Sequence, residues 1–157
     1  MNFLPDRLND YGPGSVRAPA STAGAGVELE EIMAKTVLVA EDDARIRKLV
    51  CELFACETQY ELCEQARNGK EAVEFAKRCK PDLIILDFAM PVMNGVEAAK
   101  TLKKLMPNVP IILFTWHDEV LFQHAEFIGS VVDRIVRKTD TADLIEHVRE
   151  LAPVHPN

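Results

Sequence analysis

Short apolar runs alternate with amphipathic helical segments five times between residues 36 and 151. Three of the runs are apolar at every position: Val37–Ala40, Leu83–Leu86 and Ile111–Phe114. Continuous apolar strands are typical of a parallel sheet covered by helices on both faces, because strands with one wet face alternate apolar and polar residues instead. The sequence therefore predicts an α/β fold, a doubly wound five-stranded parallel sheet.

Two further strands complete the predicted sheet. One is expected around residues 60–64, where Tyr60 and Leu62 alternate with polar neighbours as in an edge strand, and the other over Arg134–Arg137. Apolar residues at helical spacing predict five helices, over residues 46–54, 72–79, 98–106, 118–128 and 144–151. The fourth of these helices has the weakest pattern.

The length of 157 residues suits one domain of ordinary size. Residues 1–34 contain four of the seven glycines and three of the nine prolines, which predicts a disordered leader. The folded domain is expected over residues 35–152. A short tail over 153–157 would follow it, with no output domain attached.

Charge and hydropathy narrow the classes of partner. Lys plus Arg is 18 against 25 for Asp plus Glu, and the net charge of −7 has the wrong sign for sequence-independent binding to nucleic acid. No apolar run approaches the roughly 18 residues that would suggest a membrane span, and the N-terminus lacks a secretory pattern. We therefore expect a cytoplasmic protein that binds neither nucleic acid nor membrane. The four cysteines form no C-x-x-C motif, so reduced, packed thiols are expected.

Polar side chains stand where the predicted strands end, which is where open α/β sheets bind their ligands. They are Glu41-Asp42-Asp43 after the first strand, Asp87 after the third, Thr115 after the fourth and Lys138 after the fifth. Neighbouring carboxylates repel one another unless a cation neutralises them, and a few carboxylates with a main-chain carbonyl suit Mg²⁺. The pattern predicts a magnesium site at Glu41, Asp42 and Asp87.

A metal beside a carboxylate, a hydroxyl and an ammonium group forms a site for a phosphoryl group. The Asp87 carboxylate can act as a nucleophile and form an acyl phosphate, Lys138 can pair with the new charge, and the Thr115 hydroxyl can donate to it. Acids and hydroxyls after strands often only cap the next helix, as we expect for Asp43 and for Asp140 or Thr141. Five such groups at four strand ends favour the chemical interpretation.

Four parts of the sequence together resemble the receiver domain of two-component response regulators, over about residues 35–152. They are Val37–Asp43, Pro81–Gly95, Pro110–Thr115 and Lys138. The resemblance implies the flavodoxin-like (β/α)5 receiver fold and assigns roles within the site. Asp87 would be the phosphoacceptor, Thr115 the switch hydroxyl and Lys138 the ion-pair partner, while Glu41, Asp42, Asp87 and the main-chain carbonyl of Ala89 would bind Mg²⁺.

By this resemblance the protein is a single-domain response regulator, which takes phosphate from a sensor histidine kinase or a histidine phosphotransfer protein and switches binding to a downstream protein partner. It would assist its own phosphorylation and dephosphorylation but act on no outside substrate, so it would not be an enzyme. One alternative is a receiver-like interaction module that phosphorylation does not regulate. Another is a phosphatase or transferase with an aspartyl-phosphate intermediate, which usually needs a second acid where Ala89 stands.

Several positions depart from the family pattern. Ile135 stands where the family usually has Tyr or Phe, which puts the aromatic readout of the switch in doubt. Thr139 replaces the usual proline and with it the cis bond that many receivers hold there. Trp116 replaces a small residue, and it could either screen the site or pack over the fourth helix. Ala89 and His117 stand at positions that tune acyl-phosphate lifetime in the family, although His117 could also be an ordinary surface residue.

Overall fold

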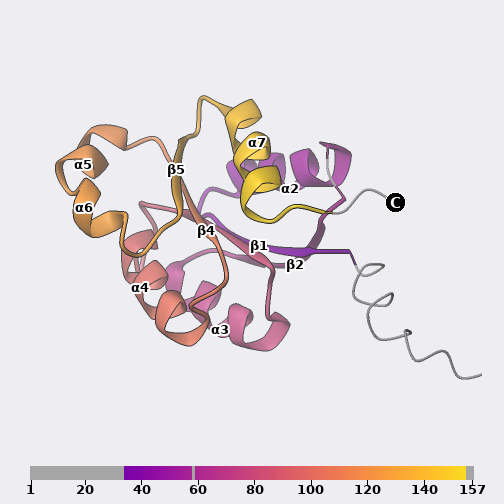
Figure 1. The fold of residues 1–157 in the computed structure, drawn as a ribbon, viewed down its shortest axis with the longest axis horizontal. Helices are drawn as coiled ribbons and strands as arrows, with labels where there is room; N and C mark the ends of the chain where they lie inside the picture. The colour runs from indigo at the N-terminus through magenta and orange to yellow at the C-terminus, as the bar shows by residue number, and fades with distance from the viewer. Residues whose placement is uncertain (1–33, 58, 155–157) are drawn as a thin grey trace, which may run out of the picture. The chain divides into compact units, whose positions relative to one another are not determined.

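The computed structural model describes residues 34–57 and 59–154, where five parallel strands form one sheet in the order β2-β1-β3-β4-β5 (Figure 1). The strands are β1 (Thr36–Ala40), β2 (Glu61–Ala66), β3 (Leu83–Asp87), β4 (Ile111–Thr115) and β5 (Arg134–Arg137). This confirms the predicted doubly wound fold and places β2 at an edge, as its alternation indicated. Of the predicted leader, only Ala34 belongs to the described residues.

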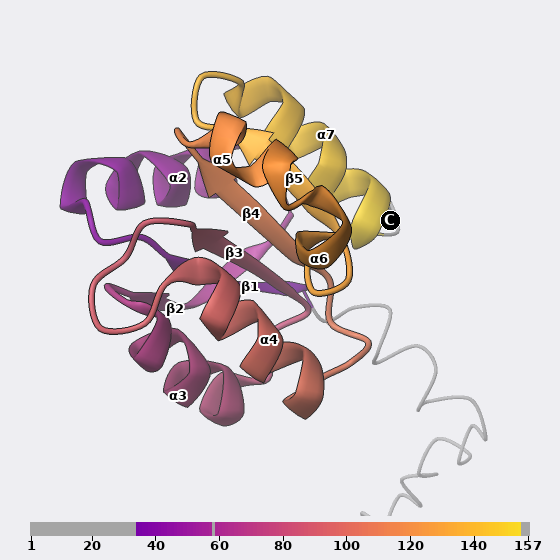
Figure 2. The ribbon, with the colours of Figure 1, turned by 90° about the vertical axis from the view of Figure 1, so that its left-hand side faces the viewer.

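Helices cover both faces of the sheet. They are α2 (Ala44–Glu57), α3 (Gly69–Cys79), α4 (Gly95–Leu105), α5 (Asp118–Gln123), α6 (Ala125–Ile128) and α7 (Thr141–Leu151). In Figure 2, α2 and α7 lie on one side of the sheet, and α3 and α4 lie on the other. The helix predicted over 118–128 is split, because His124 has φ −122° and ψ 24°, outside the helical range. No helix among the described residues is long and apolar enough to cross a membrane.

Alternate residues of the central strands pack into two separate hydrophobic cores, one on each face of the sheet. In β1, Val37 and Val39 pack with α2 and α7, whereas Leu38 and Ala40 pack with α3 and α4. Every residue of β3 and β4 is buried, which explains why these runs carry no polar residue before their last position. Burying each large apolar side chain contributes about 1.5–3 kcal/mol, so the sheet is a firm base for the groups at its carboxyl end.

The predicted helix caps are present after β1 but not after β5. Asp43 caps α2 as predicted, since its Oδ1 accepts hydrogen bonds from the N–H groups of Arg45 and Ile46. Asp140 precedes α7 but makes no side-chain cap bond. The peptide bonds of the described residues are all trans, in keeping with Thr139 in place of a proline after Lys138.

Candidate functional site

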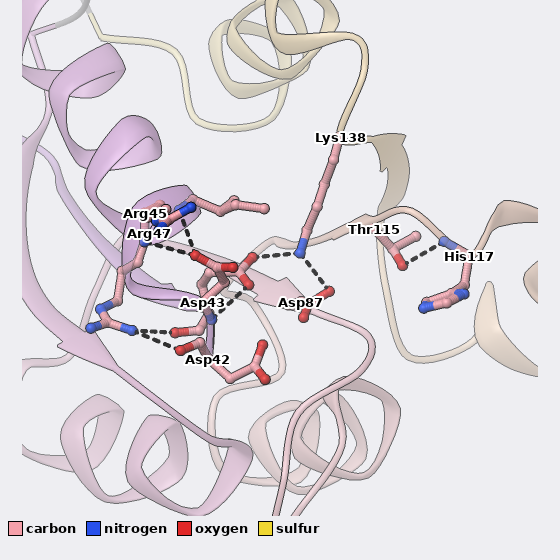
Figure 3. Close-up of polar contacts among 10 residues, drawn as sticks. Asp42, Asp43, Arg45, Arg47, Asp87, Thr115, His117 and Lys138 are labelled. Carbon is pink, nitrogen blue, oxygen red and sulfur yellow. Dashed lines mark hydrogen bonds and ion pairs between the residues drawn. The ribbon is translucent and has the colours of Figure 1, made fainter.

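The carboxyl ends of β1, β3 and β5 bring three charged side chains together. Ala40 lies opposite Leu86 in the parallel register, which sets Glu41 beside Asp87. Lys138 reaches into this pair from the end of β5, with its Nζ 2.6 Å from Oε2 of Glu41 and 3.0 Å from Oδ1 of Asp87 (Figure 3). The side chains of all three are at most 5% exposed, so the ammonium group bridges two carboxylates within the protein.

A third carboxylate completes an acidic cluster. Ligand oxygens of Glu41, Asp42 and Asp87 all lie within 4.8 Å of one another, and Asp42 is exposed while the other two are buried. Carboxylate oxygens at this spacing, open to solvent on one side, suit Mg²⁺, which keeps several waters and needs only a few protein ligands. The predicted convergence of these three residues is therefore observed, and the residues present fit the ion.

The electrostatics of the cluster also favour an added cation. Burial raises the pKa of Glu41 to about 7, and the charge of Asp87 raises it too, although the hydrogen bond from Lys138 opposes both effects. Burial likewise raises the pKa of Asp87, again against the pull of Lys138. The single ammonium group of Lys138 thus does not fully compensate the negative charge of the two buried carboxylates.

A cavity of about 230 Å³ opens over the cluster. Its walls come from the ends of β1, β3 and β5 and from the segment after β4: Glu41, Asp42, Asp43, Ile46, Asp87, Ala89, Trp116, His117 and Lys138. Trp116 is 55% exposed and lines this cavity, so it stands at the rim of the site. That position favours the interpretation that Trp116 screens the site.

Thr115 ends β4 with its side chain fully buried, next to the bridged pair but directed elsewhere. Its Oγ1 accepts a hydrogen bond from the backbone N–H of His117 at 3.0 Å, and Figure 3 shows the hydroxyl pointing to that amide. The main chain links it to the site, because the N–H of Lys138 donates to the carbonyl of Thr115 at 3.0 Å. The structure therefore places Thr115 beside the charged groups without joining its hydroxyl to them.

Arg47 is a site residue that the sequence analysis did not identify. Its Nη1 donates to the main-chain carbonyl of Glu41 at 2.6 Å and lies 3.4 Å from that of Asp42 (Figure 3). The arginine therefore holds the acidic loop from the first turns of α2. Arg47 lies in α2, a few residues after Glu41 and Asp42, and this basic residue so soon after the acidic pair is a signal that could have identified it.

The fold and the acidic cluster define a class of protein, and comparisons with known proteins identify the same class. The family model for the response regulator receiver domain matches residues 37–149. The chain belongs to this family. Receiver domains interact with histidine kinases and downstream effectors, and they generally bind Mg²⁺ at an acidic pocket.

Two sequence relatives illustrate the match. The chain is 41% identical over 81 residues to the chemotaxis protein CheY of Thermotoga maritima, covering 52% of this chain and 67% of that protein. It is 45% identical over 83 residues to a protein-glutamate methylesterase/protein-glutamine glutaminase of Vibrio vulnificus, covering 53% of this chain. The match spans only 22% of that longer relative.

Solved structures show the same fold. The response regulator domain of Thermotoga maritima CheB has a TM-score of 0.69 at 26% identity, covering 79% of this chain and 100% of that one. The response regulator protein TrrA of the same organism, in complex with Mg(2+)-BeF, has a TM-score of 0.67 at 32% identity. That match covers 74% of this chain and 98% of TrrA.

Proposed function

We propose that this protein is a phosphorylation-controlled binding switch, in which Asp87 accepts a phosphoryl group from a sensor histidine kinase or a histidine phosphotransfer protein. The observation that carries the proposal is the buried bridge from Glu41 through Lys138 to Asp87. The Asp87 carboxylate can act as the nucleophile within an open cavity. The ammonium group beside it can stabilise the negative charge of an incoming phosphoryl group.

The transfer conserves atoms and electrons. An oxygen of the Asp87 carboxylate attacks phosphorus, the phosphorus–nitrogen bond to the donor imidazole breaks, and the leaving nitrogen keeps the electron pair and takes up a proton. Glu41, Asp42, Asp87 and the main-chain carbonyl of Ala89 would hold Mg²⁺, which when bound supplies positive charge that offsets the phosphoryl oxygens.

Two residues would respond to the new group. Lys138 would exchange part of its contact with Asp87 for the phosphoryl oxygens, which carry more charge than the carboxylate. Thr115 would give up its contact with the His117 amide and donate to a phosphoryl oxygen. That movement would pull on the segment between β4 and α5, and so alter the surface offered to a downstream protein.

Phosphorylation of Asp87 is tested with acetyl phosphate and Mg²⁺, followed by intact mass measurement. We expect one labile phosphoryl group on the wild type and none on Asp87→Asn. A matched control is Asp140→Asn, which removes an exposed acid two residues from Lys138 and should be labelled like the wild type. Chelation of Mg²⁺ should abolish labelling.

A second variant separates acceptance of phosphate from the response to it. Lys138→Ala should still be labelled in part, because the nucleophile remains, but it should lose the phosphorylation-dependent change in partner affinity. An unchanged response would contradict the role of Lys138.

Ile135 and Thr139 favour one other function, an interaction module that phosphorylation does not regulate. Absence of labelling from acetyl phosphate and from histidine kinases would contradict the switch and favour this module.

A further inference from the structure

Two cysteines that are far apart in the sequence meet at the edge of the sheet away from the acidic cluster. Cys63 lies in β2 and Cys79 is the last residue of α3, yet their Sγ atoms are 2.8 Å apart. Both residues are half-buried, and both are free thiols. A covalent disulfide needs about 2.05 Å between the sulfurs, so the pair lies within about 1 Å of bonding distance.

Cys63 lies on the face of the sheet that α3 covers. The register of β1 with β2 runs Val37 opposite Leu62 and then Leu38 opposite Glu64, so Cys63 is the extra residue without a partner in β1. Leu62 packs against the core on the other face, so the alternation of the strand directs Cys63 to α3. Here Cys63 reaches Cys79, while its neighbour Glu64 pairs with Arg78 in the same last turn of α3.

The other two cysteines occupy different surroundings. Cys51 is buried in the core between α2, α7 and the sheet, whereas Cys63 packs against the core on the opposite face. Cys56 is exposed near the end of α2. The close pair is therefore specific to Cys63 and Cys79.

We propose that Cys63 and Cys79 form a reversible disulfide by exchange with a small-molecule disulfide such as glutathione disulfide. A thiolate of the protein attacks one sulfur of the small disulfide, whose other half leaves as a thiolate and is protonated. The second protein thiol then gives up its proton and attacks the mixed disulfide, which releases the second small thiol. The two protein thiols lose two electrons in total, and the small disulfide gains them.

The surroundings of Cys63 affect how readily it reacts. Burial, together with the contact with Cys79, raises the pKa of the Cys63 thiol to about 12. Because the thiolate is the nucleophile, this slows attack by Cys63 at neutral pH. Whichever thiol attacks first, the other is already in contact with it and resolves the mixed disulfide.

The bond would tie the edge strand to the end of α3. The other end of this helix supports the loop after β3, since the N–H of Gly69 donates to the carbonyl of Met93 at 2.9 Å. A link between β2 and α3 constrains the unfolded chain more than the native one, so the oxidised protein should melt at a higher temperature. This inference does not depend on phosphorylation of Asp87.

The test uses the full chain with Cys56→Ser, which removes the exposed thiol. After incubation with glutathione disulfide, we expect a product lighter by two hydrogen atoms, with one alkylatable thiol when denatured and a higher melting temperature. Dithiothreitol should reverse all three changes. In the same background, neither Cys63→Ser nor Cys79→Ser should lose two hydrogen atoms, and each should keep its melting temperature on treatment with glutathione disulfide.

Three results would overturn the inference. Three alkylatable thiols after prolonged treatment with excess glutathione disulfide would show that the pair does not bond, and this measurement needs neither of the additional variants to fold. A link to Cys51, or a lower melting temperature on oxidation, would show that the bond does not fit the native fold.

Discussion

Two neighbouring helical regions flank the site, and they are held in different ways. Helix α4 begins with a capping box, in which Asn94 and Glu97 exchange hydrogen bonds between side chains and backbone. It buries Ala98, Ala99 and Leu102 in the core. Helices α5 and α6 meet at His124, and neither has a side-chain cap bond at its start. Helix α4 is therefore firmly held, whereas the segment of α5 and α6 is held more weakly.

The two regions also begin at different parts of the proposed machinery. Helix α4 follows the loop from Asp87, and the N–H of Gly95 donates to the carbonyl of Phe88 at 3.0 Å. Helix α5 follows Thr115, whose hydroxyl holds the amide of His117. Elements that move in switching come from the less stable parts of a fold. We therefore expect α4 to hold Asp87, the proposed phosphoacceptor, in place while α5 and α6 change conformation.

The largest effect is expected at the first residue of α4. A Cβ atom on Gly95 would lie 2.2 Å from the carbonyl oxygen of Asp87, so Gly95→Ala must displace the end of β3 that carries Asp87. We expect it to lower the free energy of unfolding by about 3 kcal/mol or more. Urea unfolding measures the loss, and labelling by acetyl phosphate should fall with it.

The matched glycine lies at the end of α6. A Cβ atom on Gly129 would come no closer than 3.0 Å to the backbone, and its φ of −62° suits alanine. Gly129→Ala should therefore change the free energy of unfolding by less than about 1 kcal/mol. An equal loss from both variants would remove the distinction between a fixed and an adaptable region.

An intermediate effect is expected from two buried leucines of the same core. Leu102 of α4 is 0% exposed and Leu121 of α5 is 1% exposed. Leu→Ala substitutions cost about 2–5 kcal/mol, and the cost falls where the surroundings can collapse into the space. We expect a loss of about 3 kcal/mol for Leu102→Ala and about 2 kcal/mol for Leu121→Ala, because α5 has more freedom to adjust. Urea unfolding of both variants checks the order, and the reverse order would contradict it.

The sequence was sufficient to predict the parts of the fold and site that follow from general rules. Strands apolar at every position place β1, β3 and β4 inside a parallel sheet, and the carboxyl ends of such strands collect the ligand-binding groups. The same rules predict Glu41, Asp42, Asp87 and Lys138 as residues of the site. The sequence does not predict that Lys138 forms ion pairs with both Glu41 and Asp87, because these contacts depend on side-chain conformation.

Other features depend on local geometry that periodicity does not report. The contact of Cys63 with Cys79 joins β2 to the last residue of α3, and periodicity within each element does not report which side chains meet between them. The break at His124 has no glycine or proline to mark it, and the weak pattern of 118–128 was the only sign. The direction of the Thr115 hydroxyl depends on the backbone amide of His117, which no residue type encodes.

The smallest effect is expected from the caps themselves. The Oδ1 atom of Asn94 accepts from the N–H of Glu97 at 2.9 Å, and Asn94→Ala should lower the free energy of unfolding by about 1 kcal/mol. His117 stands at the corresponding position of α5 without a side-chain cap bond, so His117→Ala should change it by less than about 0.5 kcal/mol. Urea unfolding of both variants under one set of conditions resolves the difference. Equal losses would mean that α5 is held at its start by contacts as strong as the capping box of α4, and it would then be a poor candidate for the moving part of a switch.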